Sequence, residues 1–169
     1  MFFAIPKFPY ILISTRVGSS TITIPFTIFV ITENIRLGKN PYMNESQLIQ
    51  ISKNPLVTIG SHTKSHKKLS KLSHSLMLEE IKESKEYLEH NLNKKVTAFS
   101  YPYGIYNKKT INLVKECGYE LAFSSNFGAN YSKQSKHLLS RTEIWDTDDL
   151  FYFKQKLNCD WDWLKYRSL

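Results

Sequence analysis

The chain of 169 residues has 41% apolar and 14% aromatic residues, which is enough for one domain with a hydrophobic core and excludes a disordered tail. Its 23 Lys and Arg against 15 Asp and Glu give a formal net charge of +8. The lysines are scattered, and neither an arginine-rich face nor an RNA-binding signature accompanies them, so no nucleic-acid binding is expected.

The N-terminal stretch, MFFAIPKFPYILIS, is apolar but contains no long apolar run, because Pro6, Lys7 and Pro9 interrupt it. A membrane-spanning helix needs about 20 apolar residues. A signal peptide has a basic start, an unbroken apolar centre and a cleavage site of small residues. The stretch has none of these three features. We therefore expect an atypical segment over residues 1–20, no membrane span and a cytoplasmic location, followed by one domain over residues 21–169.

Three elements are predicted in the first third of that domain. TITIPFTIFVIT, from Thr21, is rich in β-branched and aromatic residues and is typical of a strand buried on both faces. NESQLIQIS predicts a helix that begins with a capping box of Asn44 and Gln47. PLVTIG, residues 55–60, predicts a second buried strand that ends in glycine.

The remaining elements alternate between helix and strand. SLMLEEIKESKEYLEHNL predicts a helix capped by Ser75, with its charged residues, glutamates included, facing solvent. KVTAFSYPYG predicts a strand that runs into a Pro-Tyr-Gly turn, and NKKTINLVKECG predicts a helix capped by Asn107. YELAFSS and LLSRTEIW predict two more strands, and DTDDLFYFKQKL predicts a last helix capped by Asp146 or Thr147.

This strand–helix alternation indicates an α/β fold with a parallel sheet or barrel. In such folds, functional sites form at the C-terminal ends of the strands. His62 follows the strand that ends at Gly60 by two residues, so it lies where a site is expected.

His62 and His66 lie four residues apart in the stretch IGSHTKSH. On a helical turn this spacing puts both imidazoles on one face, which suits zinc because zinc binds imidazole nitrogens. The spacing alone leaves open the alternative of two polar residues in an ordinary loop. His74 and His90 have no such partner and are expected on a solvated helix face.

These segments together resemble the polysaccharide deacetylase family, also known as the NodB-homology group or carbohydrate esterase family four. The resemblance covers residues 24–157 and includes the family's H-[ST]-x-x-H motif followed by a strand and a PYG motif. It is carried by IPFTIFVI, IGSHTKSHKKLSKLS, EEIKESKEYLEHNL, VTAFSYPYGIYN and KECGYELAFSSNFGAN.

The resemblance implies a distorted (β/α) barrel, a divalent metal that is usually zinc, and removal of acetyl groups from N-acetylated oligo- or polysaccharides. His62 and His66 match the family's metal-binding histidines. Tyr103, in the motif that also holds Tyr101 and Pro102, matches the residue whose backbone N–H helps form the oxyanion hole. Arg141 matches an active-site arginine of one subgroup.

Ser100 stands where many members of the family have arginine. A further departure concerns the family's Thr-Phe-Asp-Asp-Gly motif, whose two aspartates supply the general base and the third metal ligand. That motif would fall near residues 5–6, where no aspartate is present. The stretch around it is typical of what a shifted reading frame or a wrong start would produce.

Hydrolysis of an amide needs an activated water, a polarised carbonyl and a base; zinc supplies the first two and a carboxylate the third. No aspartate occurs before Asp146, so we expect a barrel incomplete at its first strand, weakly bound zinc and impaired activity. Asp146 or Asp148 would serve as a substitute base only if the late strand returns beside the histidines.

Two alternatives remain open. One is a non-catalytic carbohydrate-binding module of the same fold, in which Tyr101, Tyr103 and Tyr106 stack on sugars. The other is that another chain or an upstream segment supplies the missing strand.

His137 precedes a leucine, which reverses the family's late Leu-x-His motif, so we expect His137 to be a surface residue.

Overall fold

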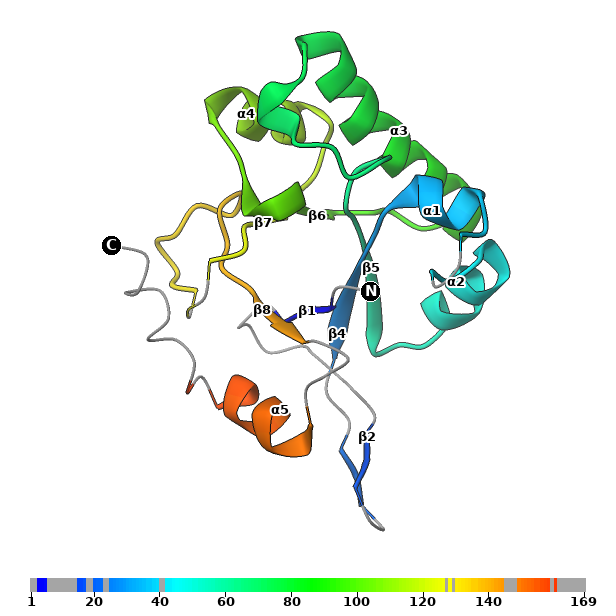
Figure 1. The fold of residues 1–169 in the computed structure, drawn as a ribbon, viewed down its shortest axis with the longest axis vertical. Helices are drawn as coiled ribbons and strands as arrows, with labels where there is room; N and C mark the ends of the chain where they lie inside the picture. Colours follow the sequence, from blue (N-terminus) through cyan, green and yellow to red (C-terminus); the bar gives the residue numbers. More distant parts are fainter. Residues whose placement is uncertain are drawn as a thin grey trace.

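The computed structural model describes residues 3–5, 15–17, 20–22, 25–39, 42–126, 128, 130–144, 149–158 and 160 (Figure 1). The strands are β1 (Phe3–Ile5), β2 (Thr15–Val17), β3 (Ser20–Ile22), β4 (Phe26–Val30), β5 (Val57–Ser61), β6 (Ala98–Ser100), β7 (Leu121–Phe123) and β8 (Thr142–Ile144). The helices are α1 (Thr32–Arg36), α2 (Glu45–Ser52), α3 (His74–Leu92), α4 (Lys108–Glu116) and α5 (Leu150–Leu157), with the 3₁₀ turns η1 (Leu69–Lys71) and η2 (Pro102–Gly104).

The predicted α/β class is confirmed in the middle of the chain. Strands β4, β5, β6 and β7 are parallel neighbours in a six-stranded sheet of order β7-β6-β5-β4-β1-β8. Helices α2, α3 and α4 lie in the crossovers between these strands. Because parallel strands end at the same edge, the loops that follow β4, β5 and β6 meet there.

Helices α1 to α4 lie together on one side of the parallel strands (Figure 1). The residues of the main core come from these helices and from the strand face toward them, where successive side chains alternate between the two faces. Ile28 and Val30 point into this core, whereas Phe29 belongs to a second, smaller cluster with Ala98 and Phe123.

The helix caps follow the sequence with two corrections. The capping boxes of Asn44 with Gln47 and of Asn107 with Thr110 are present. The cap of helix α3 lies two residues earlier than expected, because the Ser73 side chain, and not that of Ser75, accepts from the backbone of the first turn. The cap of α5 is Asp149, and residues 145–148, which include the predicted caps, lie outside the described part of the chain.

The single strand predicted from Thr21 is wrong, since the segment forms two strands in different sheets. Strand β3 pairs antiparallel with β2, and β4 begins after Pro25 in the main sheet. A proline has no N–H to donate to a ladder, which favours a strand boundary at this residue.

The expectation of an incomplete barrel with an ill-fitting first strand agrees with the arrangement of β1. This three-residue strand runs antiparallel to β4 and to β8, and its residues Phe-Ala-Ile include no carboxylate. The strands β7 and β8 stand at opposite ends of the sheet order, so the described strands do not close into a barrel.

A cavity of about 380 Å³ lies on the face of the sheet opposite helices α1 to α4, beside Thr27, Thr58, Leu121 and Phe123.

Within the described residues, no helix is both long enough and apolar enough to cross a membrane.

Gly60 allows a close contact inside this second cluster. A Cβ atom at Gly60 would lie 2.6 Å from the Phe29 ring and 3.1 Å from the Ala98 carbonyl oxygen. The Phe29 ring also packs on Phe123, with 5.4 Å between the ring centroids, so it has little freedom to move away.

We predict that Gly60→Ala lowers the free energy of unfolding by about 1–3 kcal/mol, the usual cost of overpacking a core. Urea unfolding followed by circular dichroism measures this. In a Phe29→Leu background, which makes room beside residue 60, the same substitution should cost clearly less. Equal costs in the two backgrounds would contradict the steric explanation.

Candidate active site

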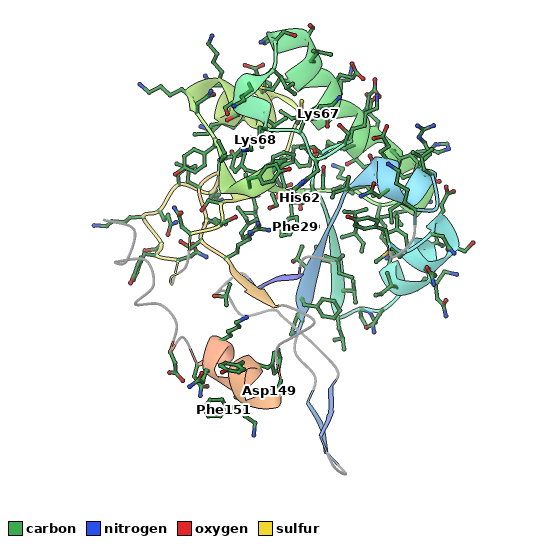
Figure 2. All side chains as sticks on the ribbon, in the orientation of Figure 1. Phe29, His62, Lys67, Lys68, Asp149 and Phe151 are labelled. Atoms are coloured by element: carbon green, nitrogen blue, oxygen red, sulfur yellow. The ribbon has the colours of Figure 1, made fainter. Side chains whose placement is uncertain are left out.

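Two loops meet at the C-terminal edge of the parallel strands. One follows β5 and carries the two histidines, and the other follows β6 and contains the Pro-Tyr-Gly turn. Figure 2 shows His62 close to Phe29 at the end of the strands, with Lys67 and Lys68 further from the sheet. The register pairs Ser61 of β5 with Phe99 of β6, so the two loops leave the sheet at the same level.

The two histidines converge as the sequence predicted. Their Nε2 atoms lie 3.0 Å apart and their ring centroids 4.6 Å apart. His62 is 1% exposed, so the pair sits at the inner end of the loop and not on the surface. The arrangement offers two imidazole nitrogens to one point.

The two histidines do not lie on a helical turn. Thr63 and His66 have positive φ angles of 67° and 61°, which is the left-handed region that non-glycine residues rarely adopt. The His66 amide donates to Thr63 Oγ1 at 2.9 Å, and the Glu33 amide of α1 donates to the Lys64 carbonyl at 2.9 Å. The imidazoles are therefore brought together by a tight, externally supported loop and not by helical periodicity.

The orientation of the His62 ring is set from β6. Its Nδ1 lies 2.8 Å from the Ser100 carbonyl oxygen, which can only accept, so Nδ1 carries the hydrogen and donates. The Nε2 atom of the neutral ring then carries the lone pair that faces His66. This is the tautomer in which a histidine can ligate a metal through Nε2.

Both histidines are held neutral. Burial and then the positive charge of Arg141 lower the pKa of His62 to about 3, although the hydrogen bond to Ser100 acts in the opposite direction. Burial and Arg141 also lower the pKa of His66, against the opposing charge of Glu80. Each ring is therefore available as a neutral donor of a lone pair at physiological pH.

Arg141 comes from the segment just before β8 and is 3% exposed. Its Nη2 donates to Ser125 Oγ at 3.0 Å, and its charge acts on both histidines. The structure thus brings Arg141 into the neighbourhood of the pair, across a long separation in sequence.

The Pro-Tyr-Gly turn places Tyr103 at the mouth of the site. Its φ is 58°, its side chain is 55% exposed, and its ring centroid lies 4.6 Å from that of His66. The Lys68 ammonium lies 5.2 Å from the centre of the same ring. Gly104 is required here, because a Cβ at its φ of +66° would lie 2.7 Å from Ser125.

The proposed tyrosine platform needs correction. Tyr101 is fully buried, and its hydroxyl donates to the His137 carbonyl at 3.1 Å. Pro102 is buried as well, and Tyr106 is only partly exposed and packs on Tyr101 with 5.4 Å between ring centroids. Of the three tyrosines named for sugar stacking, only Tyr103 presents a largely exposed ring.

Glu80 was missed because its helix was expected to direct every glutamate toward solvent. It is 4% exposed, and its carboxylate accepts from the Ser65 amide at 2.8 Å and from the Ser65 hydroxyl. The signal was available: residue 80 lies three positions after Met77 and four before Ser84, so it shares their buried face.

His137 is not the simple surface residue that was expected. It is half-buried, and its Nε2 donates to the Tyr119 carbonyl oxygen at 2.9 Å. This bond ties the segment after β7 to the end of α4, so His137 is occupied by a structural contact. His74 and His90, in contrast, are exposed as predicted.

The predicted substitute base cannot be placed, since Asp146 and Asp148 lie outside the described residues. In the part of the chain that the structure describes, no group of three or more His, Cys, Asp or Glu side chains gathers in a way that could hold a metal ion. Ser100, at the position where many relatives carry arginine, has a buried hydroxyl with no hydrogen-bond partner among the described residues.

Comparisons with known proteins agree with this geometry. A polysaccharide deacetylase of Bacillus subtilis, YxkH, is 28% identical over 118 residues, which cover 70% of this chain and 41% of YxkH. The poly-β-1,6-N-acetyl-D-glucosamine N-deacetylase of Staphylococcus aureus is 28% identical over 141 residues, which cover 76% of this chain and 47% of the enzyme. The chain thus spans less than half the length of either curated relative.

The fold is also shared with solved deacetylases. The Streptococcus pyogenes deacetylase PplD, solved in complex with acetate, superposes with a TM-score of 0.69 at 26% identity, covering 77% of this chain and 57% of that structure. A sequence model of the family described as polysaccharide deacetylase matches residues 21–122, which is more than half of the chain. This protein therefore belongs to the polysaccharide deacetylase family.

Proposed function

We propose that this chain is built for metal-dependent removal of acetyl groups from N-acetylated sugars, and that its activity is impaired as the sequence stands. The observation that carries the proposal is the convergence of His62 and His66, whose Nε2 atoms lie 3.0 Å apart. Family membership supplies the reaction class.

The histidine pair fits part of a zinc site. Zinc–imidazole bonds of about 2.0–2.1 Å in a tetrahedral arrangement separate two ligand nitrogens by about 3.3 Å. The observed separation is close to that value, and both rings are in the required neutral state. Among the described residues His62 and His66 are the two ligands that we assign, and an ion held by these two alone would bind weakly.

A bound zinc would polarise the acetyl carbonyl and activate a water molecule. The residues of this chain would then orient the substrate and stabilise charge. The exposed backbone turn at Tyr103 would direct its N–H toward the carbonyl oxygen as negative charge develops there. Arg141, whose charge already reaches both histidines, would add a positive field at the same place.

The general base is the missing part. Strand β1 has no carboxylate, and among the described residues near the histidines Glu80 already accepts two hydrogen bonds from Ser65. A positioned base contributes typically about 10²–10⁴-fold to a rate. The chain as given should therefore retain binding elements but little turnover.

The substrate class follows from the relatives. The Staphylococcus aureus relative is named for poly-β-1,6-N-acetyl-D-glucosamine, and PplD was solved with acetate, the acid that deacetylation would release. We propose an N-acetylated oligo- or polysaccharide as the substrate. The exposed Tyr103 ring beside His66 would contact a sugar face.

A non-catalytic carbohydrate-binding protein is the second candidate. The lack of a carboxylate on β1 favours this second candidate, because a site without that carboxylate would bind a sugar without hydrolysing its acetyl group. The burial of Tyr101 weakens it, since a single exposed tyrosine makes a small platform.

Calorimetry should detect weak zinc binding at one site in the parent chain. We predict that His62→Ala or His66→Ala removes it, because either change leaves one ligand. His90→Ala is the matched control, since His90 is exposed on α3 and should leave binding unaltered. Tight binding by the parent would show that a third ligand had been overlooked.

Acetate release from chitooligosaccharides with added zinc tests the catalytic proposal. We predict turnover only in a variant whose residues 1–20 are replaced by a strand ending in Thr-Phe-Asp-Asp-Gly, with a gain of about 10²-fold or more from the restored base. His62→Ala in that variant should abolish the activity. Robust zinc-dependent release by the unaltered chain, lost in Asp146→Asn, would instead identify Asp146 as the base.

The neutral state of His62 also makes stability depend on pH. An unfolded histidine takes up a proton near pH 6.5, whereas folded His62 resists protonation down to about pH 3, so the unfolded state binds more protons between these values. With a chelator present, the free energy of unfolding should therefore fall as the pH is lowered from 6.5 to about 4.5.

His62→Gln removes this titration while keeping an N–H group near the Ser100 carbonyl. Its unfolding free energy should fall less steeply over the same pH range, as measured by urea unfolding at each pH. Equal slopes in parent and variant would show that the His62 pKa is not lowered in the folded protein.

A further inference from the structure

The loop between His62 and His66 has a conformation that needs support from outside. Thr63 and His66 both have left-handed φ angles within a few residues, and Thr63 is β-branched, which makes this backbone especially unfavourable. Such conformations persist only where surrounding contacts over-determine them. In this loop the contacts come from the helices packed against it.

Helix α1 supports the first part of the loop through the Glu33 amide, and Glu80 of α3 supports the part next to His66. Both carboxylate oxygens of Glu80 accept from Ser65: Oε2 from the amide at 2.8 Å and Oε1 from the hydroxyl. The backbone carbonyl of Glu80 also accepts from the Lys64 amide at 3.0 Å. Glu80 thus binds the two loop residues that immediately precede His66.

The burial of Glu80 shows that this contact is costly to maintain. Its side chain is 5% exposed, on a helix face that it shares with the buried Met77 and Ile81. Its nearest cation, the Lys67 ammonium at 3.6 Å, belongs to a side chain that is 61% exposed. Burying a carboxylate costs free energy unless its oxygens are hydrogen-bonded or paired, whereas an apolar residue would fill the same space without that cost. We therefore expect the bonds of Glu80 to the loop to have a role.

The other glutamates of this region act differently. Glu79 and Glu83 hold the Lys64 ammonium at 2.6 and 2.9 Å, in ion pairs whose side chains are partly exposed. Exposed ion pairs of this kind contribute little to stability. Of these three glutamates, Glu80 is the one that contacts the loop backbone beside His66 from a buried position.

We propose that Glu80 is the positioning residue of the histidine pair: by holding Ser65 from α3, it sets the backbone of His66 so that the His66 ring faces His62. His62 itself is fixed separately, by burial and by the Ser100 carbonyl. The consequence for metal binding rests on the proposed function. The consequence for ring geometry does not.

Nuclear magnetic resonance of the metal-free protein tests the geometry. The parent should show a contact between the His62 and His66 rings and slow exchange of the Ser65 amide. Glu80→Leu removes both acceptor oxygens and keeps a side chain of similar size on the buried face of α3. It should weaken the ring contact and speed amide exchange at Ser65 by at least about tenfold, while His62 keeps its bond to Ser100.

Titration with Co²⁺, followed by its visible absorption, tests the effect on the site. Residues that orient metal ligands typically change metal affinity by about 10–100-fold when mutated. Glu80→Leu and Ser65→Ala should each weaken Co²⁺ binding by about tenfold. Glu86→Leu is the matched control, because Glu86 forms an exposed i,i+4 pair with Lys82 on the same helix and should change affinity by less than about twofold.

The outcomes distinguish the positioning role of Glu80 from the proposed metal site. If the parent binds no Co²⁺ but Glu80→Leu disrupts the ring contact, the metal proposal fails and the positioning role stands. If Glu80→Leu keeps both the ring contact and the Ser65 protection, the positioning role is wrong whatever the metal does. Should Glu80→Leu not fold, Ser65→Ala decides, because it removes one of the two side-chain bonds and leaves the helix intact.

Discussion

The hydrogen bond from His62 Nδ1 to the Ser100 carbonyl is the contact on which the site depends. It joins the loop after β5 to the end of β6, and it exists because parallel strands deliver both segments to the same edge of the sheet. It orients the ring and selects the tautomer whose Nε2 faces His66. The burial that protects this bond also keeps His62 neutral beside Arg141, since a charged ring there would be both desolvated and repelled.

Two buried residues with charged side chains, Arg141 and Glu80, lie in the region of the histidine pair. The charge of Arg141 acts on both histidines, and the carboxylate of Glu80 accepts two bonds from Ser65. The resemblance to the family implies a further carboxylate from the first strand. Here β1 is antiparallel, apolar and short, so it contributes backbone pairing to the sheet without contributing charge to the site.

The two faces of the sheet carry different clusters of described residues. Phe29, Ala98 and Phe123 form a small cluster on the face opposite helices α1 to α4, and a cavity of about 380 Å³ lies next to it. In a closed barrel, side chains from all strands fill the interior. The larger core lies on the other face, between the strands and helices α1 to α4.

The family, the parallel strands and the capping boxes could be predicted from the sequence, because they depend on local patterns and short motifs. The same holds for the approach of His62 to His66, which the spacing of the two residues indicates. The sequence could not determine the left-handed loop that brings the imidazoles together, or the contact that Glu80 makes with Ser65 of that loop. Both depend on how α3 packs against β5, which is a contact between distant segments. The approach of Arg141 to the histidines likewise arises only when the chain folds back onto the sheet, since no spacing in the sequence encodes that distance.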